Sequence, residues 1–163
     1  MDYRDVEPGV ERWTAGEEIL ELTDSLGFNA QAAGWIYEPE NAQWKYYLIT
    51  TMVDEQGPRW IYSRLLKVFA KVNLPPGITP LDIYIASPKD ALYKALMAAG
   101  TPEMMAKGKS DHPEKKFFRL AVTNIEIAPG VGLARAMFYR AERIERKPKP
   151  KLFDKRVEQM LAA

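Results

Sequence analysis

Few residues in this chain have the types and spacing that catalysis requires. Its 163 residues include one histidine, His112, and no cysteine. A thiol nucleophile, a cysteine-ligated zinc and a metal site built from several histidines are therefore excluded within one chain. A Ser-His-Asp triad would have to use His112, which follows Ser110 and Asp111 in a polar stretch. Triad residues converge in space rather than in sequence, so a solvated loop histidine is the better interpretation.

One pattern has the residue types of a metal-dependent nuclease site. Such sites combine an aspartate with an acid-x-Lys tripeptide on a neighbouring strand, because two carboxylates hold Mg²⁺ and the lysine steadies the attacking water. Asp82 lies in an expected strand, and Glu114-Lys115-Lys116 precedes another. These residues are common and their spacing is free, and a loop is a poor place for a rigid site. A nuclease-like enzyme is therefore the third-ranked function, and no catalytic or metal-binding residue is assigned.

A basic stretch near the C-terminus is the second candidate. As a strand, residues 133–146 would place Arg135 and Arg143 on one face and Arg140 and Arg146 on the other. An aromatic ring among arginines is a stacking platform for single-stranded nucleic acid. The predicted nucleic-acid-binding residues are Arg135, Tyr139, Arg140, Arg143, Arg146, Lys147 and Lys149. The alternative is a solvated edge strand, which proteins load with charge to prevent edge pairing.

Aromatic residues form the third group. The group comprises Trp35, Tyr37, Trp44, Tyr46, Trp60 and Tyr62, which fall within 28 positions. Trp and Tyr dominate the energetics of protein interfaces, but they also pack in cores with their polar atoms at the edge. Core packing is expected for Trp44 and Tyr46. Trp35, Tyr37 and Trp60 are the predicted partner-binding residues.

The charge distribution is polarised although the net charge is only +1. Residues 1–40 carry ten acidic and two basic side chains, whereas residues 135–163 carry nine basic and four acidic ones. Such asymmetry indicates either a basic binding surface or two ends that attract each other. Two solvated faces of opposite sign are an equally simple explanation.

Periodicity and turn residues predict an α+β (mixed α/β) fold in one domain. The predicted order is α-β-β-α-β-α-β-β-α, with a mixed five-stranded sheet packed with helices. The β-α-β unit from Trp44 to Ala86 is expected to be a right-handed parallel crossover. Two of the four expected helices cover 14–26 and 59–72, a third starts at the Ser87 N-cap, and the fourth follows the 147–151 linker. The expected strands cover 34–38, 44–53, 81–86, 116–127 and 133–146. Residues 133–146 also have a helical pattern, but the short Pro-Gly turn before them favours a hairpin. The domain spans 1–146, and residues 147–163 form a basic Pro/Lys linker and a short helix packed on the domain or extending from it.

Function is inferred mainly by exclusion. The sequence has no run of about 20 apolar residues and no secretory signal, so we expect a cytoplasmic protein without a membrane partner. No cofactor is implied. The poor catalytic inventory, balanced charge and many aromatics favour a non-catalytic protein–protein interaction or accessory module. Its partner would be another protein or a second copy of the chain as a homodimer, with nucleic acid as the alternative partner.

Residues 101–115 are the expected site of first proteolytic attack. They combine turn residues and charges with no apolar period, and such segments have low local stability. Limited trypsin digestion should cut near Lys107 or Lys109 and leave two fragments that stay associated. First cleavage within 44–53, mapped by mass spectrometry, would contradict the predicted domain layout.

Overall fold

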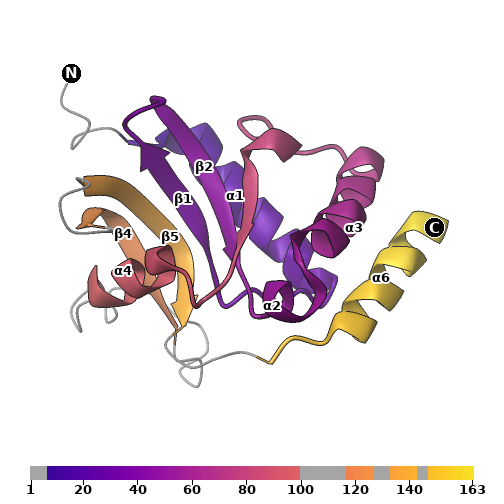
Figure 1. Cartoon of the computed structure of the whole chain (residues 1–163). Coiled ribbons are helices and arrows are strands. Elements are labelled where there is room, and N and C mark those ends of the chain that lie inside the picture. Colours follow the sequence, from indigo (N-terminus) through magenta and orange to yellow (C-terminus); the bar gives the residue numbers. More distant parts are fainter. Residues whose placement is uncertain (1–6, 100–116, 127–132, 143–146) are drawn as a thin grey trace.

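The protein folds around one five-stranded sheet (Figure 1). The structure is a computed structural model that describes residues 7–99, 117–126, 133–142 and 147–163. Its elements, in chain order, are α1 (Gly9–Ser25), β1 (Ala32–Glu38), β2 (Gln43–Ile49), α2 (Met52–Gln56), α3 (Pro58–Lys71), the 3-10 turn η2 (Pro80–Asp82), β3 (Ile83–Ala86), α4 (Ala91–Ala99), β4 (Phe117–Glu126), β5 (Leu133–Glu142) and α6 (Pro150–Ala162). The α+β class and the mixed five-stranded sheet are confirmed, and α2 is an additional short helix.

The strands lie in the order β3-β2-β1-β5-β4. β1 pairs antiparallel with β2 and β5, and β4 pairs antiparallel with β5. β2 and β3 are parallel, with α3 in the connection between them, which is the expected β-α-β unit. The choice of a strand for the segment that begins at Leu133 is confirmed, because β5 has a hydrogen-bonded neighbour on both sides.

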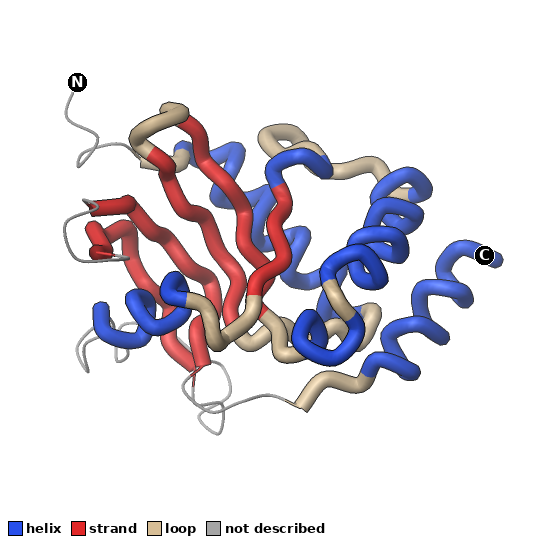
Figure 2. The backbone as a smooth tube through the Cα atoms, viewed as in Figure 1, coloured by secondary structure: helices blue, strands red, loops and turns tan. Residues whose placement is uncertain are grey.

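The two faces of the sheet are covered differently (Figure 2). One face, which we call the helix face, is covered by α1, α3 and α6. It carries Trp35, Tyr46, Leu48 and Met137, which share one core with buried residues of these three helices. The α4 face carries Ile36, Ile49, Ala136 and Phe138, which share a second core with α4. Both faces are apolar because strand side chains alternate and both sides are buried.

Three aromatic side chains of the sheet attach α1 to the helix face through hydrogen bonds. Trp35 Nε1 donates to the carbonyl of Arg12 (3.0 Å), and the Tyr46 hydroxyl donates to that of Gly16 (2.8 Å). The Tyr139 hydroxyl donates to the carbonyl of Trp13 (2.6 Å). Buried aromatics with polar atoms need such partners. The aromatic donors therefore lie against the backbone of α1 and orient the helix so that all three hydrogen bonds form.

A bulge in β5 changes which face Arg140 occupies. Ala33 of β1 pairs with Arg140, but the next residue, Gly34, pairs with Phe138, so Tyr139 is the extra residue. A bulge breaks the alternation of side chains. Tyr139 and Arg140 consequently both contact α1, on the same side as Met137. The prediction that Arg140 and Arg135 lie on opposite faces is wrong for this reason.

The acidic N-terminal and basic C-terminal parts of the chain attract each other within the fold. Arg140 forms two hydrogen bonds with the Asp24 carboxylate, at 3.0 and 2.5 Å, and a third with the carbonyl of Ala30 at 3.2 Å. Arg135 pairs with Glu7 at 2.6 Å. Bidentate arginine–carboxylate pairs are geometrically specific, so the Asp24 pair also fixes how the end of α1 meets the sheet.

Several element boundaries differ from the predictions because local hydrogen bonds override periodicity. α1 starts at Gly9 rather than Thr14, and the added turn packs Trp13 on Tyr139 with ring centroids 5.2 Å apart. β2 ends at Ile49, where the Thr50 hydroxyl accepts the amide of Met52 and starts α2. The prediction that Ser87 is the N-cap of a helix is wrong: α4 begins at Ala91, and Ser87 instead stabilises the turn before it, where its hydroxyl accepts the Lys89 amide and its own amide donates to Asp90 Oδ2.

The C-terminal helix α6 is part of the main core rather than an extension from it. Phe153 is fully buried, and its ring packs edge-on against Phe28 with centroids 5.4 Å apart. Val157, one helical turn later, is also buried in this core. Of the two arrangements expected for residues 147–163, the packed one is therefore found.

Gly16 should be intolerant of any side chain. A Cβ at this position would lie 2.3 Å from the Tyr139 hydroxyl oxygen and 2.6 Å from Trp35 Nε1. Alanine is about 1 kcal/mol better than glycine in a helix interior. We nevertheless expect Gly16→Ala to lower the free energy of unfolding by about 2 kcal/mol, since α1 must move away from its donors. Urea denaturation measures this change.

The matched control is Thr14→Ala, an exposed position on the same helix. It should be neutral or slightly stabilising, because alanine is the better helix former and nothing packs on the site. A Gly16→Ala variant as stable as Thr14→Ala would contradict the close contact between α1 and the aromatic donors.

Candidate functional site

The described members of the predicted nucleic-acid-binding set do not form one surface. Tyr139 and Arg140 are only 3% and 7% exposed, and both are committed to hydrogen bonds with α1. Arg135 is half-buried in its pair with Glu7. Lys147 and Lys149 are exposed before α6, whereas Arg143 and Arg146 lie outside the described residues. The stacking platform expected around Tyr139 is thus corrected: α1 covers the ring.

The predicted partner-binding aromatics are also mostly occupied. Trp35 is fully buried, because the face it shares with Tyr37 is the one that α1 covers. This corrects its assignment to a partner surface. Tyr37 is half-buried against Trp44, with ring centroids 5.3 Å apart. Trp60 is half-buried. Its ring centroid lies 6.0 Å from that of Phe153, and the Arg64 guanidinium lies 3.7 Å from the centre of the Trp60 ring.

Asp82 has a local structural role. Its carboxylate accepts the amide (2.8 Å) and the hydroxyl (3.1 Å) of Thr79, which caps η2. Asp82 therefore precedes β3 instead of lying in a strand as predicted. Glu114, Lys115, Lys116 and His112 lie outside the described residues. Among the residues that are described, no three or more His, Asp or Glu side chains gather as a metal site would require.

A different set of side chains meets on the α4 face, where β2 and β3 run parallel. Tyr47 and Tyr84 are directly paired in the register, so both rings project from the same face. The rings stack, with centroids 5.5 Å apart and planes inclined by 27°. Both side chains are half-buried. They form the centre of what we call the tyrosine patch.

Charged neighbours hold the patch in place. Lys45 Nζ lies 4.7 Å from the centre of the Tyr84 ring, a cation–π contact. The same ammonium group pairs with Glu38 Oε2 at 2.7 Å, and Asn41 also donates to this oxygen at 3.2 Å. These contacts come from β1, β2 and the turn between them, so the Tyr84 ring is positioned by three adjacent segments.

An exposed leucine lies close to these residues along the chain. Leu81 is 87% exposed and lies in η2, three residues before Tyr84. Most large apolar side chains of the described residues are buried, and only Val10, Leu66 and Leu81 are exposed. We therefore define the tyrosine patch as Glu38, Lys45, Tyr47, Leu81 and Tyr84.

Two backbone groups on the outer edge of β3, beside the patch, are hydrogen-bonded to a side chain. The Tyr62 hydroxyl of α3 donates to the carbonyl of Ile83 at 2.8 Å and accepts the amide of Ile85 at 3.0 Å. These are groups that a further strand would otherwise pair with. Tyr62 thus acts as a cap on β3, and a partner at this corner would contact side chains rather than add a strand.

Two groups of the patch, the Lys45 amine and the Tyr47 phenol, have raised pKa values. The hydrogen bond from Lys45 to Glu38 raises the pKa of the Lys45 amine, although burial opposes it. Burial raises the pKa of the Tyr47 phenol, and the nearby Glu38 carboxylate adds to this. Lys45 is therefore a stable cation and the Tyr47 phenol stays neutral, which suits binding better than proton transfer.

Sequence analysis did not find the tyrosine patch. Tyr47 and Tyr84 are 37 positions apart, and each looks like an ordinary strand residue. The available signal was the β-α-β unit, because a parallel crossover places its two strands beside each other. The register between the strands, which pairs the two rings, is decided only in the folded sheet.

The Glu38–Lys45 pair should control the chemical reactivity of Lys45. We expect Glu38→Gln to lower the pKa of the Lys45 amine, so that more of it is neutral and nucleophilic at pH 9. Acetylation by a small amine-directed reagent, followed by peptide mass spectrometry, should therefore be faster at Lys45 in the variant. Lys94, exposed on α4, is the internal control and should react equally in both proteins. Unchanged Lys45 reactivity would contradict the pairing.

Comparison with known proteins leaves the function to be inferred from geometry. No protein-family model, curated protein or solved structure matches this chain. Over the part of the chain that the structure describes, every helix is too short or too polar to cross a membrane. The candidate site is therefore the tyrosine patch, on the strength of its exposure and composition.

Proposed function

We propose that this protein is a non-catalytic interaction module that binds another protein through the tyrosine patch. The observation that carries the proposal is the half-exposed, stacked Tyr47–Tyr84 pair beside Leu81. Tyrosines provide large contact areas and few rotatable bonds, so little entropy is lost when they are buried by a partner. Lys45, which is paired with Glu38, already holds the Tyr84 ring in position, and this lowers the entropic cost of binding further.

The charges around the patch indicate the chemistry of the partner. Lys45 is neutralised by Glu38, while Glu40 is exposed in the adjoining turn and Asp82 lies beside Leu81. The rim is therefore acidic. A matching protein surface would present an aliphatic or aromatic side chain to Leu81 and the tyrosines, with lysine or arginine at its border.

The other hydroxyl groups of the fold support a binding role over catalysis. The Tyr46, Tyr62 and Tyr139 hydroxyls all donate to backbone carbonyls. The Ser87 hydroxyl donates to Asp54 Oδ2 at 3.0 Å and accepts the Lys89 amide in the turn before α4. Each of these groups stabilises an element, whereas a nucleophile needs a base that removes its proton.

Replacing Leu81 with serine tests the proposal. A partner is first identified by crosslinking and mass spectrometry, purified, and its Kd measured with the wild-type protein. We expect Leu81→Ser and Tyr84→Ala each to raise this Kd at least tenfold, since loss of an interface anchor costs about 1.4 kcal/mol or more. Sedimentation equilibrium of the purified protein identifies the case in which the partner is a second copy of the chain.

The matched control is Leu66→Ser, which removes an exposed leucine from α3 on another side of the sheet. Its Kd should equal that of the wild-type protein. An equal loss of affinity in Leu66→Ser and Leu81→Ser, or no loss in either patch variant, would contradict the tyrosine patch as the binding surface.

A further inference from the structure

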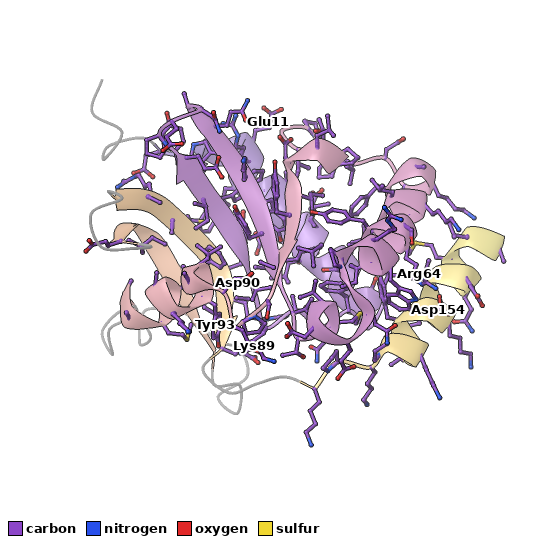
Figure 3. All side chains as sticks on the ribbon, viewed as in Figure 1. Glu11, Arg64, Lys89, Asp90, Tyr93 and Asp154 are labelled. Atoms are coloured by element: carbon purple, nitrogen blue, oxygen red, sulfur yellow. The ribbon has the colours of Figure 1, made fainter. Side chains whose placement is uncertain are left out.

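Helices α3 and α6 lie side by side and run in the same direction (Figure 1). Trp60 packs on Phe153 near their starts, Arg64 pairs with Asp154 at 2.7 Å, and Lys71 Nζ donates to the carbonyl of Leu161 at 3.0 Å near their ends. Figure 3 shows Arg64 and Asp154 facing each other across the two helices. The contacts extend along both helices, so α3 and α6 form one continuous layer.

We call α3 together with residues 147–163 the basic layer, because the positive charge of the protein is concentrated there. α3 contains four basic residues and no acidic one, and residues 147–163 contain five basic and two acidic residues. Their formal net charge is +7, although the whole chain carries only +1. Asp154, one of the two acids, is already paired with Arg64.

Packing directs the basic side chains outward. Leu65 and Val68 of α3, and Phe153 and Val157 of α6, are buried in the core. The opposite sides of the two helices carry Arg59, Lys67, Lys151 and Lys155, all exposed. Lys147 and Lys149 extend the exposed positive charge before α6 begins. The surface is therefore predominantly basic, with Glu158 as the exposed acidic side chain of α6, as expected for two amphipathic helices with cationic outer faces.

We propose that the basic layer binds the sugar–phosphate backbone of nucleic acid. Fourteen helical residues span about 21 Å at 1.5 Å per residue. A nucleic-acid strand is a regular line of charge, with one phosphate per about 3.4 Å of duplex axis. The basic layer is elongated and carries exposed basic side chains on both helices, so it can contact successive phosphates along a strand.

The surface differs from the one that the sequence indicated. The predicted residues came from one continuous stretch, and its Tyr139 and Arg140 are buried. Arg59 and Lys67 instead come from α3, far earlier in the chain, and only Lys147 and Lys149 are common to both sets. The basic layer is also separate from the tyrosine patch, whose rim is acidic, so the two binding functions can be tested independently.

Fluorescence anisotropy with a labelled 20-base-pair DNA duplex tests the proposal over a range of salt concentrations. If Arg59, Lys67, Lys151 and Lys155 contact phosphates, log affinity against log salt should have a slope near −3.6. The double variant Lys67→Gln/Lys155→Gln should flatten this slope by about 1.8, because two phosphate contacts are lost. A labelled single strand should also bind, with a shallower slope.

The matched control is Lys89→Gln/Lys94→Gln, which makes the same change in net charge at exposed positions outside the basic layer. It should retain the wild-type slope, as should Leu81→Ser in the tyrosine patch. Circular dichroism checks that every variant stays folded. Absence of binding at about 50 mM salt, or equal losses in the two double variants, would overturn the proposal. So would equally tight binding to poly-glutamate, which would assign the layer to acidic proteins.

Discussion

The contact on which the rest of the structure depends is the attachment of α1 to the sheet by Trp35, Tyr46 and Tyr139. Each side chain buries a large ring and must also satisfy a polar atom, which water would otherwise do. The backbone carbonyls of α1 meet this requirement only if the helix approaches closely, and Gly16 permits that approach. Arg140 then forms an ion pair with the carboxylate of Asp24, near the end of the same helix.

This attachment determines which surfaces are left for binding. The helix face is closed by α1, α3 and α6, so the aromatics that project from it form a core. The tyrosine patch lies on the other face, at the corner formed by β2, β3 and η2. The helical layer itself is divided by charge: α1 carries five acidic residues and one basic residue, and it lies on the same face as the basic layer. Steering of a charged partner depends on such separation rather than on net charge.

The two proposed surfaces use different physics. Binding at the tyrosine patch depends on buried apolar area and on rings that are already positioned, so it should respond weakly to salt. Binding at the basic layer depends on release of counterions and should weaken steeply with salt. A protein with both surfaces could join a nucleic acid to a second protein, and each surface can be removed without altering the other.

Sequence patterns correctly predict the order of the main elements, the α+β class and the parallel β-α-β unit, because alternation, helical periodicity and turn residues are local properties. Turn residues also mark the start of the segment 87–90, although its contacts form a turn before α4 rather than the predicted helix N-cap. Which side chains are available for binding depends on contacts between distant segments. Burial of Trp35 and Tyr139 depends on a distant helix, the face of Arg140 depends on a bulge, and the pairing of Tyr47 with Tyr84 depends on register. Each is a relation between segments far apart in the chain, and no local pattern contains it.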